Sequence, residues 1–427
     1  MSRKLSYPVA WVPSLYLAEA LPYVAVMVIA TTMYKRLGLS NTELALYTSW
    51  LYLPWVIKPL WSPFIAAIKN ERWWVLTMQL LIGAGFAGIA FTLPTASWLQ
   101  GSLAFFWLLA FASSTHDIAA DGLYILGLST HDQSLYVGIR STFYRIGNIV
   151  GQGFLVMLAG WLEKTNTIPL AWSITFLILA GSFLILWLWH TYVLPKASPD
   201  SSDSPRGESS SSVIYLALKT FFTKPHIVSA LLFMLLFRFP EGQLVKIANP
   251  FLLDATSNGG LGMDTEAVGF VYGTVGIIGL TLGGLLGGWC VSLHGLKRWL
   301  WPMVLSISLP DLVYVYLAEA AEPSFLTVNV CVFIEQFGYG FGFTAYMLYL
   351  VYFSQGERST AVFSICTAMQ ALGMMIPGMI AGWMADHLGY VNFFWWIVAC
   401  CLVTFAVSAF IKIDGKYGIK EARQESE

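Results

Sequence analysis

The chain has 427 residues, of which 57% are hydrophobic, 15% aromatic and only 11% charged. Water-soluble domains carry about 25% charged residues, so this composition excludes a soluble protein and indicates a membrane protein that crosses the bilayer several times. The net charge of −1 offers no basic surface of the kind that binds nucleic acid, and we expect no nucleic-acid partner.

Hydrophobic runs recur along the chain at lengths near the ~20 residues that a helix needs to cross a bilayer. The first run contains Glu19 and is not followed by the small residues of a cleavage site, so we expect it to remain as a membrane helix. We predict twelve spans, at 10–33, 43–67, 73–94, 99–129, 134–162, 168–193, 225–253, 265–292, 297–318, 323–353, 358–386 and 389–412.

One polar segment interrupts this pattern between the sixth and seventh spans. Residues 195–212 are too rich in serine and proline to bury a core and read as a linker. Lysine and arginine gather in the loops on one side of the predicted membrane, so we expect the linker and both termini to be cytoplasmic. The predicted organisation is an N-terminal six-helix bundle at 1–194, a cytoplasmic linker at 195–222, a C-terminal six-helix bundle at 223–412 and a cytoplasmic tail at 413–427.

The two halves of the chain resemble each other. Segments 139–164 and 357–387 both start with Arg-Ser-Thr and reach Ala-Gly-Trp shortly before an acidic residue, on the predicted fifth and eleventh helices. Paired six-helix halves around a central site are typical of the major facilitator superfamily, so we predict an all-α polytopic membrane protein with that fold. Arg140 and Arg358 begin the two segments near the cytoplasmic surface, where an arginine reaches the headgroups or closes an inner gate.

Charged residues inside the spans are the strongest functional signal. Counted at about 1.5 Å per residue from the cytoplasmic ends, Glu19, Lys58, Asp117, Asp121 and Arg145 lie near the middle of the bilayer. Ionisable groups are costly at that depth and indicate a working site. Asp117 and Asp121 are four residues apart, so both lie on one face of a single helix.

A charge count then predicts proton coupling. Lys58 and Arg145 are the available cations, and we expect Asp121 with Arg145 to be the leading ion pair. Two cations leave one of the carboxylates Glu19, Asp117 and Asp121 without a fixed partner, which is what a proton-coupled cycle requires. The alternative is an ion-pair network that only holds the helices together.

The second half of the chain carries a second group of polar residues. Arg238, Glu241 and Lys246 lie on the predicted seventh helix, which Pro240 and Pro250 are expected to break so that its backbone lines a cavity. The predicted tenth helix adds Glu335 and Gln336, followed by small and aromatic residues suited to a sugar-like ligand. We predict that substrate is bound by Arg238, Glu241, Lys246, Glu335, Gln336 and Tyr349.

Four motifs together resemble the muropeptide permease family. They are VIKPLWSPFI at 56–65, FASSTHDIAADG at 111–122, YRIGNIVGQG at 144–153 and VFIEQFGYGFGFTAYMLYL at 332–350. The resemblance places Lys58, Asp117, Asp121, Tyr144, Arg145 and Glu335 on the family's motif positions, whereas His116 stands where the family usually has glutamine. It therefore implies that Tyr144 and His116 lie beside the ion pairs, in contact with substrate.

The resemblance implies a proton-coupled secondary transporter of the bacterial inner membrane. Such a protein imports a cell-wall-derived sugar or glycopeptide of the GlcNAc-anhydroMurNAc type by alternating access, with the proton gradient as its energy source and no cofactor. We expect a monomer, because no oligomerisation signal is visible. Transport of another oligosaccharide, a siderophore or an acyl-CoA stays open.

An intramembrane enzyme is the remote alternative. An aspartyl protease needs its two aspartates on facing helices, but Asp117 and Asp121 share one helix. His116 and Asp117 alone supply too few ligands for a metal, so we expect no metal site.

Overall fold

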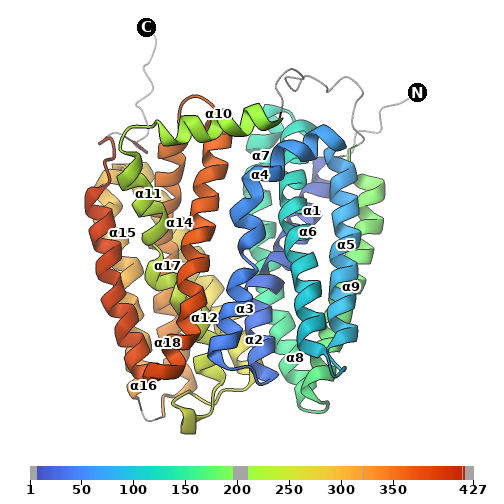
Figure 1. The fold of residues 1–427 in the computed structure, drawn as a ribbon, viewed down its shortest axis with the longest axis vertical. Coiled ribbons are helices and arrows are strands. Elements are labelled where there is room, and N and C mark those ends of the chain that lie inside the picture. Colours follow the sequence, from blue (N-terminus) through green and yellow to red (C-terminus); the bar gives the residue numbers. More distant parts are fainter. Residues whose placement is uncertain (1–6, 196–209, 321, 416, 419–427) are drawn as a thin grey trace. The chain divides into compact units, whose positions relative to one another are not determined.

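The computed structural model describes residues 7–195, 210–320, 322–415 and 417–418, and these residues form helices with no β-strand among them. The described chain divides into two compact units. The first unit runs up to Leu216 and also includes Met263–Gly273, and the second begins at Ala217 and contains the remainder. Figure 1 shows the helices of both units in colours that follow the sequence.

The first unit contains the six spans predicted before the linker. Short π-helical stretches at Ala25–Ile29 and Ile149–Leu155 join α1 to α2 and α7 to α8, so that each pair crosses as one helix. The helices are α1 (Pro8–Val24), α2 (Ala30–Arg36), α3 (Asn41–Trp50), α4 (Leu53–Ile68), α5 (Glu71–Thr92), α6 (Trp98–Gly127), α7 (Thr130–Asn148), α8 (Val156–Glu163) and α9 (Ile168–Val193).

The later helices are α10, which lies within the predicted linker, and those that correspond to the six spans predicted after it. They are α10 (Ser210–Phe222), α11 (Ile227–Leu236), α12 (Phe239–Leu253), α13 (Thr265–Phe270), α14 (Ile277–His294), α15 (Leu296–Ser308), α16 (Leu312–Glu319), α17 (Phe325–Ser354) and α18 (Ser359–Phe410). Short turns at Thr256–Asn258 and Leu309–Asp311 and a π-helix at Val271–Gly276 connect some of them.

The helix lengths are those of a multi-pass membrane protein. Within the described ranges, nine helical segments are long and apolar enough to cross a membrane. The last of these, α18, consists of two helices joined at Gly389, whose φ of 74° is a conformation that glycine adopts without strain. α17 has 30 residues and is therefore about 45 Å long, and α3 with α4 covers the predicted second span. The observed helices are consistent with twelve spans.

Two local features differ from the sequence prediction. α7 begins at Thr130 rather than at residue 134, because Ser129 caps it by accepting a hydrogen bond from the amide of Asp132 at 3.2 Å. α12 runs through Pro250 to Leu253, so the predicted break at Pro250 is wrong. Pro250 has no backbone N–H, so it costs α12 one hydrogen bond but does not end the helix. The break before Pro240 is present, where Arg238 caps α12.

Residues 210–222 lie in the segment that we assigned to the linker, and they form α10. Two side chains of this helix, Ala217 and Phe221, are buried in the core of the second unit, whereas Tyr215 and Phe222 are exposed. The serine- and proline-rich stretch at 196–209 lies outside the described residues.

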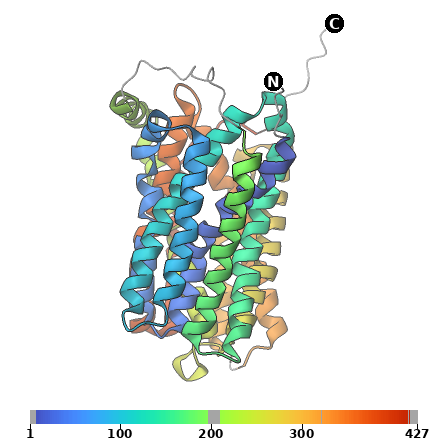
Figure 2. The same ribbon diagram turned by 90° about the vertical axis from the view of Figure 1, so that its right-hand side faces the viewer.

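Aromatic side chains fill the interior of the first unit. α5 packs against α6 and α9, and α1 packs against α6 and α7. The rings of Phe86, Phe106, Phe176 and Phe183 contact one another at the crossing of α5, α6 and α9. In Figure 2, the blue to green helices of this unit run side by side along much of their length. This packing fixes α1, α4, α6 and α7, which carry the charged residues.

Residues Met263–Gly273 were assigned from the sequence to the C-terminal bundle, but they pack with the first unit. Glycines allow this contact, because a Cβ atom on Gly273 would lie 2.0 Å from the Cα atom of Gly153. α13 packs against α8, and Thr265 donates a hydrogen bond to Glu163 at 2.8 Å.

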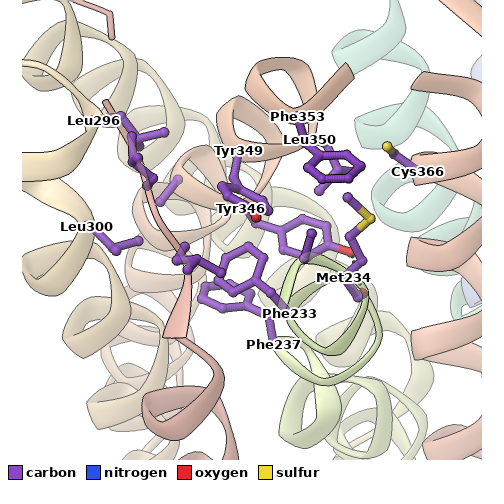
Figure 3. Close-up of a cluster of buried hydrophobic side chains, with 14 of the residues drawn as sticks. Phe233, Met234, Phe237, Leu296, Leu300, Tyr346, Tyr349, Leu350, Phe353 and Cys366 are labelled. Atoms are coloured by element: carbon purple, nitrogen blue, oxygen red, sulfur yellow. Dashed lines mark hydrogen bonds between the residues drawn. The ribbon is translucent and has the colours of Figure 1, made fainter. Parts of the chain in front are cut away.

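The core of the second unit is an aromatic cluster between α11, α17 and α18. Figure 3 shows Tyr346 and Tyr349 pointing among Phe233, Phe237 and Phe353. Tyr346 donates a hydrogen bond to the carbonyl oxygen of Met234 at 2.6 Å. The Tyr349 ring lies 4.7 Å from that of Phe233 and is 2% exposed, so this predicted substrate-binding residue is a core residue in the structure.

Candidate functional site

The first unit brings together three of the predicted proton-coupling residues. Glu19 comes from α1, and Asp117 and Asp121 come from successive turns of α6. One carboxylate oxygen of each lies within 4.8 Å of the other two. Three negative charges this close repel one another strongly in a medium of low dielectric constant, so the site depends on the groups that neutralise them.

Lys58 on α4 neutralises Asp117. The Lys58 ammonium group donates a hydrogen bond to Oδ2 of Asp117, and each side chain is 22% exposed. Lys58 lies between Pro54 and Pro59 on α4, a helix with few other charged side chains. In the structure, Lys58 and Asp117 therefore form one ion pair.

Arg140 on α7 neutralises Asp121. Its guanidinium group lies 2.6 Å from Oδ1 of Asp121. The same group stacks over the rings of Tyr16 and Tyr124, at 4.4 Å and 5.4 Å from the ring centroids. Tyr16 also donates a hydrogen bond to Asp121 at 3.2 Å. The aromatic rings and the carboxylate together hold the guanidinium group in one orientation.

This arrangement corrects the predicted partner of Asp121, which was Arg145. Because α7 begins at Thr130, Arg140 lies ten residues into the helix, at about 15 Å, and Arg145 about 22 Å from the same end. The two arginines also point about 140° apart around the helix axis, at about 100° per residue. A Ser-x-x-Asp capping sequence at Ser129 was the signal that would have located the helix start.

Glu19 is the third carboxylate of the cluster. Its side chain is 7% exposed, and its Oε2 atom is buried with no hydrogen-bond partner among the described residues. Asp117 and Asp121 are each bonded to a cation, and Glu19 lies against both of them. The cation partners already present on two of its members make this cluster a poor site for a metal ion.

His116 does not join the ion pairs, although the sequence placed it beside them. It is fully buried, and its Nε2 atom lies 3.1 Å from the Gln79 amide nitrogen on α5. That nitrogen lies 2.8 Å from Nδ1 of His190 on α9, whose Nε2 lies 2.9 Å from the Ser14 hydroxyl. No motif or spacing in the sequence links Gln79 and His190 to His116. Positions 116 and 117 point about 100° apart, which separates the two environments.

Tyr144 and Arg145 follow Arg140 on α7, and both side chains are partly exposed. Tyr144 is within electrostatic range of Glu19, Asp117 and Asp121. Tyr144 therefore lies near the carboxylate cluster.

The second unit holds another group of three carboxylates. One oxygen each of Glu241, Asp311 and Glu335 lies within 4.8 Å of the other two, and all three side chains are at most 6% exposed. Tyr314 donates a hydrogen bond to Glu335 at 3.2 Å, and the thiol of Cys401 donates one to Asp311 at 3.4 Å. Asp311 was not predicted from the sequence as a site residue.

Arg238 and Gln336 lie near this second group. Gln336 donates to the Glu335 carboxylate at 3.0 Å. Arg238 donates a hydrogen bond to the Tyr339 hydroxyl, and its guanidinium carbon lies 4.8 Å from the centroid of Phe343. Tyr339 and Phe343 are partly exposed, and they were not predicted as site residues.

The two remaining predicted residues lie in contrasting environments. Lys246 is on α12 and is 1% exposed, so it is part of the interior of the second unit. Arg358 caps α18 with a positive φ of 56° and is exposed on the connection between α17 and α18.

A separate polar cluster ties α13 to the end of α8. Arg36 lies 2.9 Å from Glu163, and Lys164 forms an ion pair with Glu266. The hydrogen bond to Glu266 raises the pKa of Lys164 above its ordinary value. These bonds hold residues 263–273 on the first unit.

Comparison with known proteins gives relatives among permeases. The chain is 24% identical over 354 residues to a protein named anhydromuropeptide permease from Escherichia coli K12, which covers 82% of this chain and 68% of that protein. It is also 24% identical over 386 residues to a putative transporter named AmpG 4 from Rickettsia conorii, which covers 88% of this chain and 90% of that protein. No family model matches the chain.

Solved structures show the fold. The crystal structure of the nucleoside transporter NupG superimposes with a TM-score of 0.71 at 17% identity, over 96% of this chain and all of that protein. The chain therefore has the all-α fold of a major facilitator superfamily transporter, as the span count and the internal repeat predicted.

Proposed function

We propose that this protein is a proton-coupled secondary transporter that imports a muropeptide of the GlcNAc-anhydroMurNAc type across the bacterial inner membrane. The observation that carries the proposal is the cluster in the first unit, where three carboxylates share two cations inside apolar helices. Its similarity to proteins named as permeases supports the substrate class. The proposed transporter acts as a monomer with cytoplasmic termini and needs no cofactor.

In the proposed cycle, protonation changes the charge balance of the cluster. A proton from the outer side neutralises one carboxylate, and Lys58 or Arg140 then has less negative charge to hold it. The released cation binds hydroxyl or carboxylate groups of the substrate. The two halves then reorient by alternating access, and loss of the proton to the cytoplasm restores the ion pairs.

The second unit supplies the proposed sugar contacts. Tyr339 and Phe343 offer partly exposed aromatic rings, and Gln336 and Arg238 add hydrogen-bond donors beside them. Aromatic rings with polar neighbours suit a molecule that has both apolar ring faces and hydroxyl groups. Glu241, Lys246 and Glu335 lie deeper and would support this surface from behind. Arg358 remains a proposed cytoplasmic gate residue, whereas Arg140, which was predicted for the same gate, lies deeper on α7 as the partner of Asp121.

Transport by purified protein in liposomes tests the proposal. We expect labelled GlcNAc-anhydroMurNAc to accumulate inside when the outside is acidic, and accumulation to stop when an uncoupler removes the gradient. Excess unlabelled substrate inside should still drive counterflow, which a carrier performs and an enzyme does not.

Competition by other ligands tests the substrate class. Uptake should be inhibited by unlabelled anhydromuropeptide and not by a plain disaccharide, an acyl-CoA or a siderophore. Stronger inhibition by any of those three would replace the proposed substrate with that class. Absence of both counterflow and accumulation for every ligand would remove the transport proposal.

A further inference from the structure

The charge balance of the first unit identifies one carboxylate that differs from its neighbours. Asp117 is bonded to Lys58 and Asp121 to Arg140, so each has a cation of its own. Glu19 has the least exposed side chain of the three, at 7%, and its buried Oε2 atom has no partner among the described residues. The cluster therefore contains one more negative charge than its two cations balance.

Burial makes this excess negative charge costly in free energy. A carboxylate that is removed from water and lacks a cation is strongly disfavoured in its ionised form. Here the penalty is increased by two aspartates whose oxygens lie within 4.8 Å of the Glu19 carboxylate. Neutralisation by a proton removes both penalties at once, because a protonated carboxyl group carries no charge and can donate a hydrogen bond.

Among the described residues, the groups around Glu19 favour it over the two aspartates as the carboxylate that binds a proton. The charged groups that act on Glu19 are Asp117 and Asp121 from α6, Arg140 from α7 and Lys58 from α4. Two tyrosines, Tyr16 on α1 and Tyr144 on α7, also lie in range. Protonating either aspartate would leave its cation without a partner, which is more costly than protonating Glu19.

We propose that Glu19 is the proton-binding residue of the transport cycle, and that Asp117 and Asp121 stay ionised as the partners of Lys58 and Arg140. This inference rests on the proposed proton-coupled transport. The proton enters from the outer solution and converts the Glu19 carboxylate to the neutral acid. It then leaves to the cytoplasmic solution, which returns Glu19 to its ionised form.

The test compares Glu19→Gln with the unchanged protein in liposomes. Glutamine has the shape of protonated glutamate and cannot release a proton. We expect Glu19→Gln to keep counterflow of labelled GlcNAc-anhydroMurNAc within about twofold and to lose the accumulation driven by an acidic outside. Substrate-dependent proton uptake, measured with a pH-sensitive dye inside the liposomes, should also disappear.

Asp254→Asn is the control, since it also replaces a carboxylate that accepts a side-chain hydrogen bond, from Tyr390, but it lies outside both groups of three carboxylates. It should keep both accumulation and proton uptake. Retention of gradient-driven accumulation by Glu19→Gln would overturn the assignment while leaving proton-coupled transport intact.

Two further outcomes distinguish the inference from the function on which it rests. If the unchanged protein itself shows no gradient-driven accumulation, the proposed proton coupling fails before Glu19 is considered. If a sodium gradient and not a proton gradient drives accumulation, the cluster holds a metal cation and the proton assignment is wrong. Loss of counterflow by Glu19→Gln in a folded protein would assign Glu19 to substrate binding instead and would also overturn the inference.

Discussion

Each unit contains a group of three carboxylates, but the two groups are satisfied in different ways. In the first unit, Asp117 and Asp121 are bonded to Lys58 and Arg140, and their side chains are 22% and 37% exposed. In the second unit, Asp311 and Glu335 are 3% exposed and accept hydrogen bonds from uncharged donors. Ion pairs that are partly exposed to solvent can break, and their charged groups can then bind substrate. Buried hydrogen bonds from uncharged donors instead hold helices together.

The largest expected effect comes from removing a cation in the first unit. Lys58→Met leaves Asp117 ionised without its partner. Loss of one member of a buried pair costs about 3 to 5 kcal/mol, and we expect the lower end because both side chains are 22% exposed. Transport should fall to background, and the thermal midpoint of the purified protein should decrease.

The double variant Lys58→Met with Asp117→Asn separates folding from function. It removes both charges, so the thermal midpoint should recover while transport stays absent. If the double variant transports at the normal rate, the pair is structural and the comparison between the two groups no longer holds.

Much of the fold could be predicted from the sequence, because the length of an apolar run is set by the thickness of the bilayer. The observed helices follow the predicted spans, and the end of α7 that was misplaced by four residues is the one set by a local cap at Ser129. That small error changed the predicted partner of Asp121, since a shift of four residues is about one helical turn.

Contacts between helices were harder to predict. Sequence spacing places residues on a helix face, but it does not show which faces of neighbouring helices pack against each other. Gln79 and His190 meet His116, and Asp311 meets Glu335, through helix packing that leaves no local signal. For Tyr349 the residue type suggested a ligand contact, but the surrounding Phe233 and Phe353 make it a core residue.

A smaller effect tests which arginine belongs to Asp121. A double-mutant cycle between Asp121→Asn and Arg140→Gln should give a coupling energy of about 1 kcal/mol in the free energy of unfolding, the upper end for partly exposed pairs. The same cycle with Arg145→Gln should give less than about 0.5 kcal/mol, the range of residues that do not interact directly. Thermal or denaturant unfolding of the purified variants measures both values.

A larger coupling for Arg145 than for Arg140 would restore the pairing predicted from the sequence.

The variant Arg140→Lys tests whether charge alone is enough at this position. Lysine keeps the charge but loses the planar group that stacks on Tyr16 and Tyr124. We expect it to recover only part of the uptake rate lost in Arg140→Gln.

The smallest effect concerns the neutral hydrogen bonds of the second unit. Tyr346→Phe removes the hydroxyl that donates to the Met234 carbonyl oxygen at 2.6 Å in a fully buried position. One such bond contributes about 1 kcal/mol, so the thermal midpoint should fall slightly. The Tyr349 ring contacts the rings of Phe233, Tyr352 and Phe353, and phenylalanine retains these contacts, so Tyr349→Phe should change stability less.

Neither tyrosine variant should alter the ratio of gradient-driven accumulation to counterflow, because neither changes a charge. That ratio is the quantity which distinguishes the two units, since only the first is expected to exchange its bonds during transport. A changed ratio in Tyr346→Phe would mean that the neutral core of the second unit also rearranges in the proton-coupled step. The partly exposed ion pairs would then not be the sole switching element.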